Sequence, residues 1–368
     1  MTDSRPRLNT LIFEITPRCN HACRHCYNVW NLSDRDYPRG ELDTHQTLML
    51  LAKALDETDC RHVTLTGGEP LLRSDLPQIL RYLHRRNVRL TIITNGRLLT
   101  EPASDELLES GAGLFELPLL SYRRDLHDYL SGSPGAFEAV LAAMNRLRAR
   151  RGMFVTVFVL TRLNLPDLSD TIRLAFAFGA HGLMLNRFNP GGRGVQHQAE
   201  LLPSAEQVRQ ALLIAEAAAL ELGFPIVCSI PIQPCLVGVG MRTNPPPDLQ
   251  SLFPHLRFGF CAAGTERAYY TIDPLGNLRP CNHTPTILGS LFEEQFSSLV
   301  APERLKSFTS AIPASCAGCA LQETCQGGCK AAAQVCYGSL SMEEPFLRRN
   351  WGGDGIFARR RMTADQLF

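Results

Sequence analysis

Between residue 10 and about residue 225, short apolar runs rich in β-branched residues alternate with longer amphipathic segments. The short runs predict strands at Thr10–Thr16, His62–Thr66, Val88–Thr94, Leu114–Leu119, Phe154–Thr161 and Gly182–Phe188. The amphipathic segments predict helices at Thr44–Glu57, Asp75–Arg85, Glu101–Ser110, Ala136–Arg150, Leu168–Phe178 and Ala205–Leu222. Strands that alternate with helices in this way predict an α/β fold with a parallel sheet.

Several of these helices have a recognisable start. Thr44, Ser74 and Ser204 stand where N-caps are expected, and Pro134 and Pro166 lie near helix entries. The six βα units are fewer than the eight that close a full barrel, and we find no later stretch that supplies two more. We therefore expect residues 1–225 to form an open, partial (βα)6 TIM-like barrel.

The character of the chain changes after Phe224. Residues 226–260 are rich in proline and poor in periodicity, which is typical of a linker. Residues 261–345 contain seven of the cysteines and little helical periodicity, so we expect a small cysteine-rich domain held mainly by metal ligands. Residues 346–368 carry a short basic run, which we interpret first as a solvated tail and second as a flap that faces the substrate.

The overall composition excludes several classes of protein. The chain has 368 residues, of which 45% are hydrophobic and 20% charged, as in an ordinary globular protein. Its formal net charge is only +1, so we expect no electrostatic attraction strong enough to bind nucleic acid. It lacks an apolar run of about 18 residues and the apolar core of a signal peptide, so we expect no membrane partner and a cytoplasmic location. Thirteen cysteines in a reducing compartment indicate metal ligation or redox chemistry.

The first cysteine group lies directly after the first predicted strand and consists of Cys19, Cys23 and Cys26. This position places the group at the carboxyl end of the barrel. Three thiols supply only three of the four ligands of a 4Fe-4S cluster, which leaves one iron open to a substrate or cofactor. His21 and His25 lie in the same loop, so on these residues alone a structural zinc site is the alternative.

The CxxxCxxC spacing followed by Tyr27 resembles the signature of the radical S-adenosylmethionine (SAM) superfamily. The second predicted strand ends in four residues that match the family motif for the amino group of SAM, namely Gly67, Gly68, Glu69 and Pro70. Paired glycines permit close backbone approach, and strand-end carbonyls accept hydrogen bonds from an ammonium group. The third strand ends near Asn95, at a position that in the family faces the cofactor from the same rim.

One stretch departs from this family pattern. Relatives with a C-terminal cluster domain carry a serine turn after the fourth strand, then His-Asp and an arginine that meets the SAM carboxylate. Counted from His127 and Asp128, the serine position falls on Leu119 and the arginine position on Ser131. Either Ser121 serves after a shorter turn, or the carboxylate is met elsewhere. The candidate replacements are Arg123, Arg124 and Arg162.

The later cysteines resemble the seven-cysteine pattern of the SPASM domain, which carries two auxiliary 4Fe-4S clusters in the family. The resemblance implies that three cysteines hold the first auxiliary cluster, namely Cys261, Cys281 and Cys329. It implies that four hold the second auxiliary cluster, namely Cys316, Cys319, Cys325 and Cys336. A zinc ribbon is the alternative for this set.

The first auxiliary cluster is one ligand short in this assignment. Some relatives place a further cysteine about six residues after the first, but that position is Arg267 here. Either Cys235 or Cys228 from the linker supplies the ligand, or the iron is open to substrate. A free buried thiol is the alternative for both linker cysteines, and Cys60 is expected in the core.

Two further segments carry charged residues of interest. The loop 186–194 follows the sixth predicted strand, and its Arg187 or Arg193 either binds a substrate carboxylate or belongs to a plain loop. We interpret Glu343 and Glu344 as a surface acidic pair.

Taken together, the resemblance implies reductive cleavage of SAM to a 5'-deoxyadenosyl radical that abstracts a hydrogen from the substrate, with three 4Fe-4S clusters in all. The auxiliary clusters favour net oxidation, and the first choice of substrate is a ribosomally made peptide that is cross-linked or dehydrogenated. An electron donor such as flavodoxin or ferredoxin is implied, and a separate protein that recognises the peptide is an optional partner. The alternative is an oxidoreductase or decarboxylase of a small molecule such as a tetrapyrrole. A non-enzymatic iron-sulfur or zinc protein is the third reading.

Overall fold

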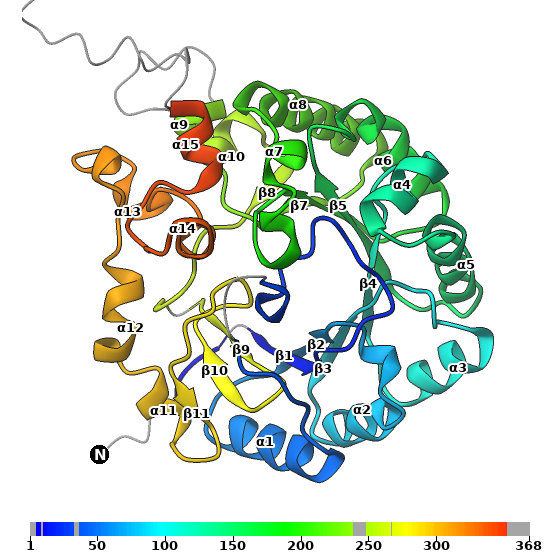
Figure 1. Ribbon diagram of the computed structural model, residues 1–368. Helices are drawn as coiled ribbons and strands as arrows, with labels where there is room; N and C mark the ends of the chain where they lie inside the picture. The colour runs from blue at the N-terminus through cyan, green and yellow to red at the C-terminus, as the bar shows by residue number, and fades with distance from the viewer. Residues whose placement is uncertain (1–4, 9, 33–36, 238–247, 266, 352–368) are drawn as a thin grey trace, which may run out of the picture.

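The structure is a computed structural model that describes residues 5–8, 10–32, 37–237, 248–265 and 267–351. Its strands form one sheet in the order β11-β10-β9-β1-β2-β3-β4-β5-β6-β7-β8. Neighbours from β1 to β8 are all parallel, so their carboxyl ends share one rim (Figure 1). The strands are β1 (Thr10–Thr16), β2 (His62–Gly67), β3 (Arg89–Ile93), β4 (Leu114–Pro118), β5 (Phe154–Leu160), β6 (Leu183–Arg187), β7 (Ile226–Cys228), β8 (Leu256–Phe258), β9 (Tyr269–Ile272), β10 (Asn277–Arg279) and β11 (Gly289–Ser290).

Helices surround the outer side of the curved sheet, while the segment after β1 crosses the inside of the curve (Figure 1). The α-helices of the barrel region are α1 (Thr44–Asp56), α2 (Leu76–Arg85), α3 (Glu101–Glu109), α4 (Arg124–Ser131), α5 (Ala136–Ala149), α6 (Leu168–Ala177), α7 (Gln198–Leu201) and α8 (Ala205–Leu222). The later α-helices are α9 (Pro234–Val237), α10 (Leu249–Leu252), α11 (Phe296–Leu299), α12 (Pro302–Thr309), α13 (Gln322–Cys325), α14 (Lys330–Tyr337) and α15 (Pro345–Trp351). Short 3-10 helices are η1 (Val29–Asn31), η2 (Pro70–Leu72), η3 (Leu165–Asp167), η4 (Gly192–Val195) and η5 (Ala314–Cys316). Along the described ranges, we find no helix with the length and apolarity needed to cross a membrane.

The six predicted strands and six predicted helices are confirmed, each end within one residue of its expected place. Ser204 caps α8 as predicted, since its hydroxyl accepts a hydrogen bond from the Gln207 amide at 3.1 Å. The other two caps were placed wrongly. Asp43 caps α1 in a reciprocal arrangement with Gln46, and α2 begins after Asp75 instead of after Ser74.

The segment 226–260 differs from the predicted linker, because β7 and β8 lie in it and extend the sheet beyond β6. Each of these strands has only three residues, which is too short to show a period of two in the sequence. The chain therefore continues the barrel sheet at this edge instead of leaving it. Residues 238–247 of the expected linker lie outside the described residues.

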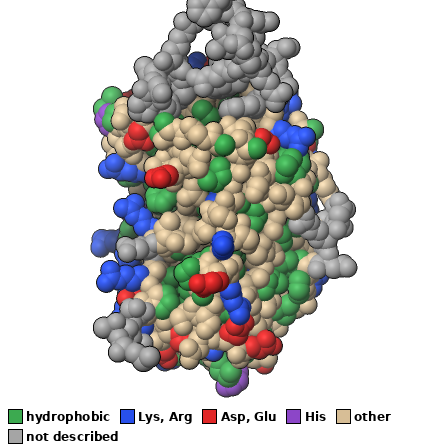
Figure 2. Space-filling view, turned by 90° about the vertical axis from the view of Figure 1, so that its left-hand side faces the viewer, with side chains coloured by type: hydrophobic (Ala, Val, Ile, Leu, Met, Phe, Trp, Pro, Cys, Tyr) green, Lys and Arg blue, Asp and Glu red, His purple; other side chains and the backbone are tan. Residues whose placement is uncertain are grey.

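The cysteine-rich region joins the other edge of the sheet. Strand β9 pairs with β1 in parallel, and β9, β10 and β11 continue antiparallel. The side chain of Asp273 closes the β9–β10 turn by accepting from the amides of Leu275 and Asn277, each at 2.9 Å. Figure 2 looks onto the side of the molecule where α11, α12 and α13 lie, and charged side chains are sparse over its middle.

The core lies between the sheet and the outer helices. Along β4, β5 and β6, fully buried side chains such as Phe115, Phe158 and Leu185 alternate with partly exposed ones. Successive side chains of a strand point to opposite faces, so the partly exposed set, which includes Glu116 and Met184, faces the inside of the open barrel. The rim and this inner face are therefore the surfaces that the fold presents to a bound molecule.

Candidate functional site

The first cysteine group lies at the rim, in the loop that follows β1. Cys19 is exposed, while Cys23 and Cys26 are half-buried. The Cys26 amide donates to the Cys23 carbonyl at 3.2 Å, so these two cysteines share one turn. Burial raises the pKa of Cys23, and Cys26 and Cys19 also raise it. Two N–H groups point at the sulfurs, since the His21 amide donates to Cys19 Sγ at 3.4 Å and the Asn31 amide group donates to Cys26 Sγ at 3.5 Å.

Loops after β4 and β6 hold this cysteine loop in place, a function that the sequence did not reveal. The Arg24 amide donates to the Leu130 carbonyl at the end of α4 at 3.0 Å, and the Gly194 amide in η4 donates to the Cys26 carbonyl at 2.9 Å. Gly132 and Gly192 have positive φ angles of 57° and 43°, and a Cβ at either would lie within 2.4 Å of a backbone oxygen of the cysteine loop. The glycines after both strands were the available signal.

The loop after β6 carries a cation. Arg193 lies in η4, whose next residue, Gly194, donates its amide to the Cys26 carbonyl at 2.9 Å. The charge of Arg193 lowers the pKa of both Cys19 and Cys23, although burial raises each more strongly. It would offset part of the negative charge of three thiolates.

The two histidines of the loop are both neutral. Burial lowers the pKa of His21 and of His25 to about 4. His21 accepts a hydrogen bond at Nε2 from Arg97 Nε at 3.0 Å, so this nitrogen already has a partner. Over the described residues, no three histidine, cysteine or acidic side chains converge as ligands of a single metal ion.

Gly67 and Gly68 bring the end of β2 against the end of β1. A Cβ at Gly67 would lie 2.3 Å from the Thr16 carbonyl oxygen, and one at Gly68 would lie 2.0 Å from the Arg18 carbonyl oxygen. The Gly67 carbonyl accepts from the Asn28 side chain at 2.7 Å, so Asn28 uses one acceptor position of a carbonyl that we expected to be free for an ammonium group. The glycines therefore pack the motif onto the cysteine loop itself.

Glu69 links the ends of β2 and β3. Its carboxylate is buried and accepts from the Leu71 amide at 3.0 Å, the Thr94 hydroxyl at 2.7 Å and the Asn95 amide at 2.8 Å. Burial raises the pKa of Glu69 to about 7, against the effect of these hydrogen bonds. Pro70 opens η2 directly after it. Glu69 thus fixes the end of β2 relative to the end of β3 at the rim.

Asn95 and Tyr27 both turn toward other parts of the site. The Asn95 side chain donates to Asn20 Oδ1 in the cysteine loop at 2.7 Å. The Tyr27 ring lies 4.2 Å from the His283 ring between centroids, and its hydroxyl accepts from the Asn282 side chain at 3.0 Å. Because Asn282 and His283 directly follow Cys281, Tyr27 connects the first cysteine loop to the later cysteines.

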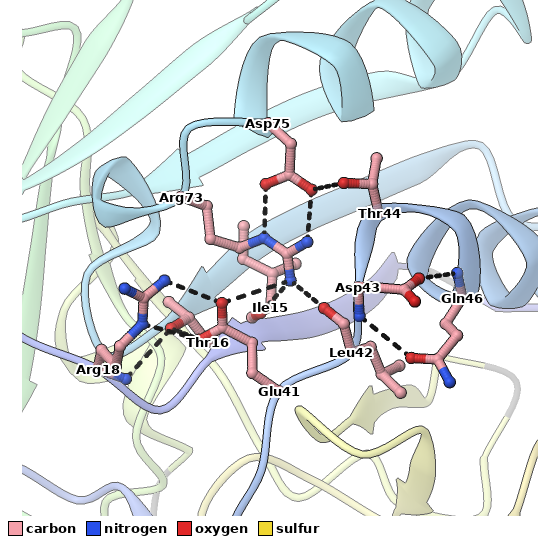
Figure 3. Close-up of polar contacts among 10 residues, drawn as sticks. All are labelled: Ile15, Thr16, Arg18, Glu41, Leu42, Asp43, Thr44, Gln46, Arg73 and Asp75. Atoms are coloured by element: carbon pink, nitrogen blue, oxygen red, sulfur yellow. Dashed lines mark hydrogen bonds and ion pairs between the residues drawn. The ribbon is translucent and has the colours of Figure 1, made fainter.

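The start of the cysteine loop is fixed by a polar network at the end of β1 (Figure 3). The buried guanidinium of Arg73 donates to the carbonyls of Ile15 at 2.8 Å and Leu42 at 2.9 Å, and it pairs with Asp75 at 2.5 Å. Figure 3 also shows Glu41 pairing with Arg18, one residue before Cys19, at 2.9 Å. The segments on both sides of the cysteine loop are therefore tied to the barrel.

The residues considered for the SAM carboxylate have protein partners. Ser121 is fully buried and donates to Asp167, which also pairs with Arg123 at 3.0 Å. Arg124 pairs with Glu138 on the surface, and Arg162 is exposed and donates to the Ala199 carbonyl at 3.1 Å. Leu119 and Ser131, where the family pattern falls, are both buried.

Arg187 and Glu344 form a buried ion pair at 2.5 Å, with side chains that are 0% and 1% exposed. Our interpretations of Arg187 as a substrate ligand and of Glu344 as a surface acid were therefore wrong. The first residues of the expected tail are buried as well. Phe346 and Leu347 are both fully buried, and the Arg187 guanidinium lies over the Phe346 ring, 4.7 Å from its centroid. Its residues 352–368 lie outside the described part of the chain. A pair separated by 157 residues leaves no local sequence signal.

Two cavities lie among the later cysteines. The first-auxiliary cavity is lined by Cys261, Cys281 and Cys329 together with Tyr269, His283 and Lys330. Asn189 donates to Cys329 Sγ at 3.2 Å, and burial raises the pKa of Cys281 to about 12 and that of Cys329 to about 11. These three cysteines come together as the resemblance implied.

The second-auxiliary cavity is lined by Cys316, Cys319 and Cys325, and its fourth cysteine is Cys235. This differs from the expected assignment, in which Cys336 joined this set and Cys235 was a candidate for the other one. Cys228 is buried in β7 and is not among the described residues that line either cavity. Cys60 is buried in the core as predicted.

Comparison with known proteins identifies the same family. Residues 13–175 match the model of the radical SAM superfamily. A PqqA peptide cyclase of Ruegeria pomeroyi is 30% identical over 96% of this chain and 94% of its own length, and one of Xanthomonas campestris is 27% identical over 100% and 92%. The crystal structure of Streptococcus suis SuiB bound to the precursor peptide SuiA superimposes with a TM-score of 0.69 at 16% identity, covering 94% of this chain and 76% of SuiB. SuiB and this chain therefore share a fold.

Proposed function

Because this chain belongs to the radical SAM superfamily, we propose that it is an oxidoreductase that cleaves SAM reductively and oxidises a ribosomally made peptide. The observation that carries the proposal is the meeting of Cys19, Cys23 and Cys26 with the Gly67–Pro70 motif at one rim. Three thiols leave one iron of a 4Fe-4S cluster without a protein ligand. SAM would reach that iron from the rim.

Cluster and SAM together supply a 5'-deoxyadenosyl radical when both are bound, and the residues of this chain bind, orient and shield them. Cys19, Cys23 and Cys26 would hold the cluster. The backbone at Gly67 and Gly68 would approach SAM closely, with Glu69 fixing the rim behind it. We propose Tyr27 and Asn95, both next to the cysteine loop, as further cofactor-binding positions. Ser121 is buried against Asp167 and Arg162 binds the Ala199 carbonyl, so neither supports the same proposal.

We further propose that residues 261–345 form a SPASM domain with two auxiliary clusters, which brings the total to three. The two cysteine-lined cavities support two clusters, and the segment 226–260 also contributes to their lining, as with Pro231 and Cys235. Auxiliary clusters would take electrons from the substrate, which favours cross-linking or dehydrogenation. A chain with thirteen cysteines that are proposed mainly as iron ligands fits a cytoplasmic location, where thiols stay reduced.

The peptide substrate rests on the relatives named PqqA peptide cyclase. The inner face of the barrel is the place where a peptide side chain would approach the rim. Glu116 on β4 offers a carboxyl group there, and burial raises its pKa to about 7. An electron donor such as flavodoxin or ferredoxin, and a protein that delivers the peptide, complete the proposed system.

Anaerobic reconstitution tests the proposal. We expect about twelve irons per chain and slow release of 5'-deoxyadenosine from SAM in the presence of dithionite. A peptide encoded beside the gene is expected to accelerate this release and to lose two hydrogens, as seen by mass spectrometry. Stoichiometric zinc without charge-transfer absorption would contradict the whole proposal, while acceleration by a tetrapyrrole instead of a peptide would contradict the substrate class.

A Glu69→Ala variant is expected to bind SAM at least about tenfold more weakly while the first cluster keeps its iron. The change removes three hydrogen bonds that hold Leu71, Thr94 and Asn95 at the rim, each worth about 1 kcal/mol. Equilibrium dialysis with SAM measures the effect. Glu138→Ala, which removes a surface carboxylate, is the control and should bind SAM like the unchanged protein. Equal affinity in both variants would show that Glu69 has no such function.

A further inference from the structure

We propose that Cys235 is the fourth cysteine ligand of the second auxiliary cluster, beside Cys316, Cys319 and Cys325. The inference rests on the proposed function, because it assumes that this cavity holds a 4Fe-4S cluster. It departs from the ligand set that the family resemblance implied, in which the fourth position belonged to Cys336. The cluster would then join the barrel sheet, through the segment after β7, to the C-terminal region.

The cavity itself carries the proposal. Four of the residues that line it are cysteines, and Cys235 reaches it from α9, which follows β7 in the chain. The other three cysteines come from η5, the turn after it and α13. Four thiolates around one cavity are the complete ligand set of a 4Fe-4S cluster. Three thiolates would leave one iron open, as at the first cysteine group.

Hydrogen bonds anchor α9 to the loop that carries Cys325. The buried side chain of Gln233, two residues before Cys235, donates to the Gly327 carbonyl at 3.2 Å. It also donates to Glu344, which in turn pairs with Arg187 on β6. These buried hydrogen bonds hold Cys235 at the cavity, so the proline-rich segment does not have to bend further for Cys235 to reach it.

Cys336 lies on α14, and none of the described residues that line the second-auxiliary cavity comes from this helix. Among the described residues that line the second-auxiliary cavity, Cys336 does not occur. Cys235 likewise does not line the first-auxiliary cavity, which is left with three cysteines.

The test uses the full chain with Cys19, Cys23 and Cys26 replaced by alanine, so that only the auxiliary clusters contribute iron. After anaerobic reconstitution we expect about eight irons in this background. Adding Cys235→Ala should remove between about one and four of them, and adding Cys235→Ser should change the electron paramagnetic resonance spectrum of the reduced protein. Cys336→Ala should leave both readouts unchanged. Cys228→Ala, which removes another buried thiol near α9, is the matched control for folding and should also keep about eight irons.

A second measurement avoids substitution at Cys235. Iodoacetamide should alkylate Cys235 in the protein stripped of iron and fail to do so in the reconstituted protein, as read by peptide mass spectrometry. Alkylation in both states, or iron loss in Cys336→Ala but not in Cys235→Ala, would overturn the inference. The unchanged chain would then still hold about twelve irons and cleave SAM. A failure of the proposed function would instead appear as an unchanged chain without SAM cleavage.

Discussion

Replacing Cys19, Cys23 and Cys26 together with alanine is expected to lower the iron content from about twelve to about eight per chain and to abolish the release of 5'-deoxyadenosine from SAM. The three thiols lie in the loop that follows β1 at the rim, and Nε2 of His21 in the same loop already accepts a hydrogen bond from Arg97. Without them, no iron is available at the place where SAM would bind. The loss of activity should therefore be complete.

Iron analysis and chromatography of the nucleoside product measure the two effects. Cys60→Ala is the control, because this thiol is buried in the core and donates to the His62 carbonyl at 3.1 Å. Cys60 precedes β2, whereas the rim is formed by the carboxyl ends of the strands. It should keep about twelve irons and full SAM cleavage. Residual cleavage in the triple variant would mean that another cluster reduces SAM, and the assignment of the rim site would be wrong.

The barrel could be predicted from the sequence because its signals are local. Each of β1 to β6 is long enough to show as an apolar run, and each helix beside it has an apolar face that packs on the sheet. The three-residue strands β7 and β8 carry no such signal. Their place in the sheet is set by pairing with β6 and with each other, which are tertiary contacts.

The candidate site was predictable only where its residues are close in sequence. The spacing of Cys19, Cys23 and Cys26 and the Gly67–Pro70 motif could be recognised directly. The loops that support them could not, since Gly132 and Gly192 act by letting distant backbone segments approach. Cys235 was a candidate for the first auxiliary cluster because that cluster was one ligand short in the family assignment, and only the fold places it at the other cavity.

Besides the pairing of β1 with β9, a buried ion pair between Glu14 on β1 and Arg279 on β10 joins the barrel to the cysteine-rich region. Both side chains are essentially inaccessible, at 1% and 0% exposure. Arg279 also donates to the Thr284 carbonyl at 2.9 Å, in the loop that follows Cys281. The pair thus fixes one wall of the first-auxiliary cavity relative to the strand that leads to the first cysteine loop.

An Arg279→Met variant is therefore expected to lower the free energy of unfolding by about 3–5 kcal/mol, because it leaves the Glu14 carboxylate buried without its cation. Anaerobic urea unfolding of the reconstituted protein measures the loss. Arg173→Met, which breaks the exposed pair with Glu221, is the control and should cost at most about 1 kcal/mol. Adding Glu14→Gln to Arg279→Met should recover part of the loss, since the unpaired charge is then removed. A cost for Arg279→Met as small as that of the control, or a double variant that is worse than the sum of the two changes, would show that the pair does not hold the barrel and the cysteine-rich region together.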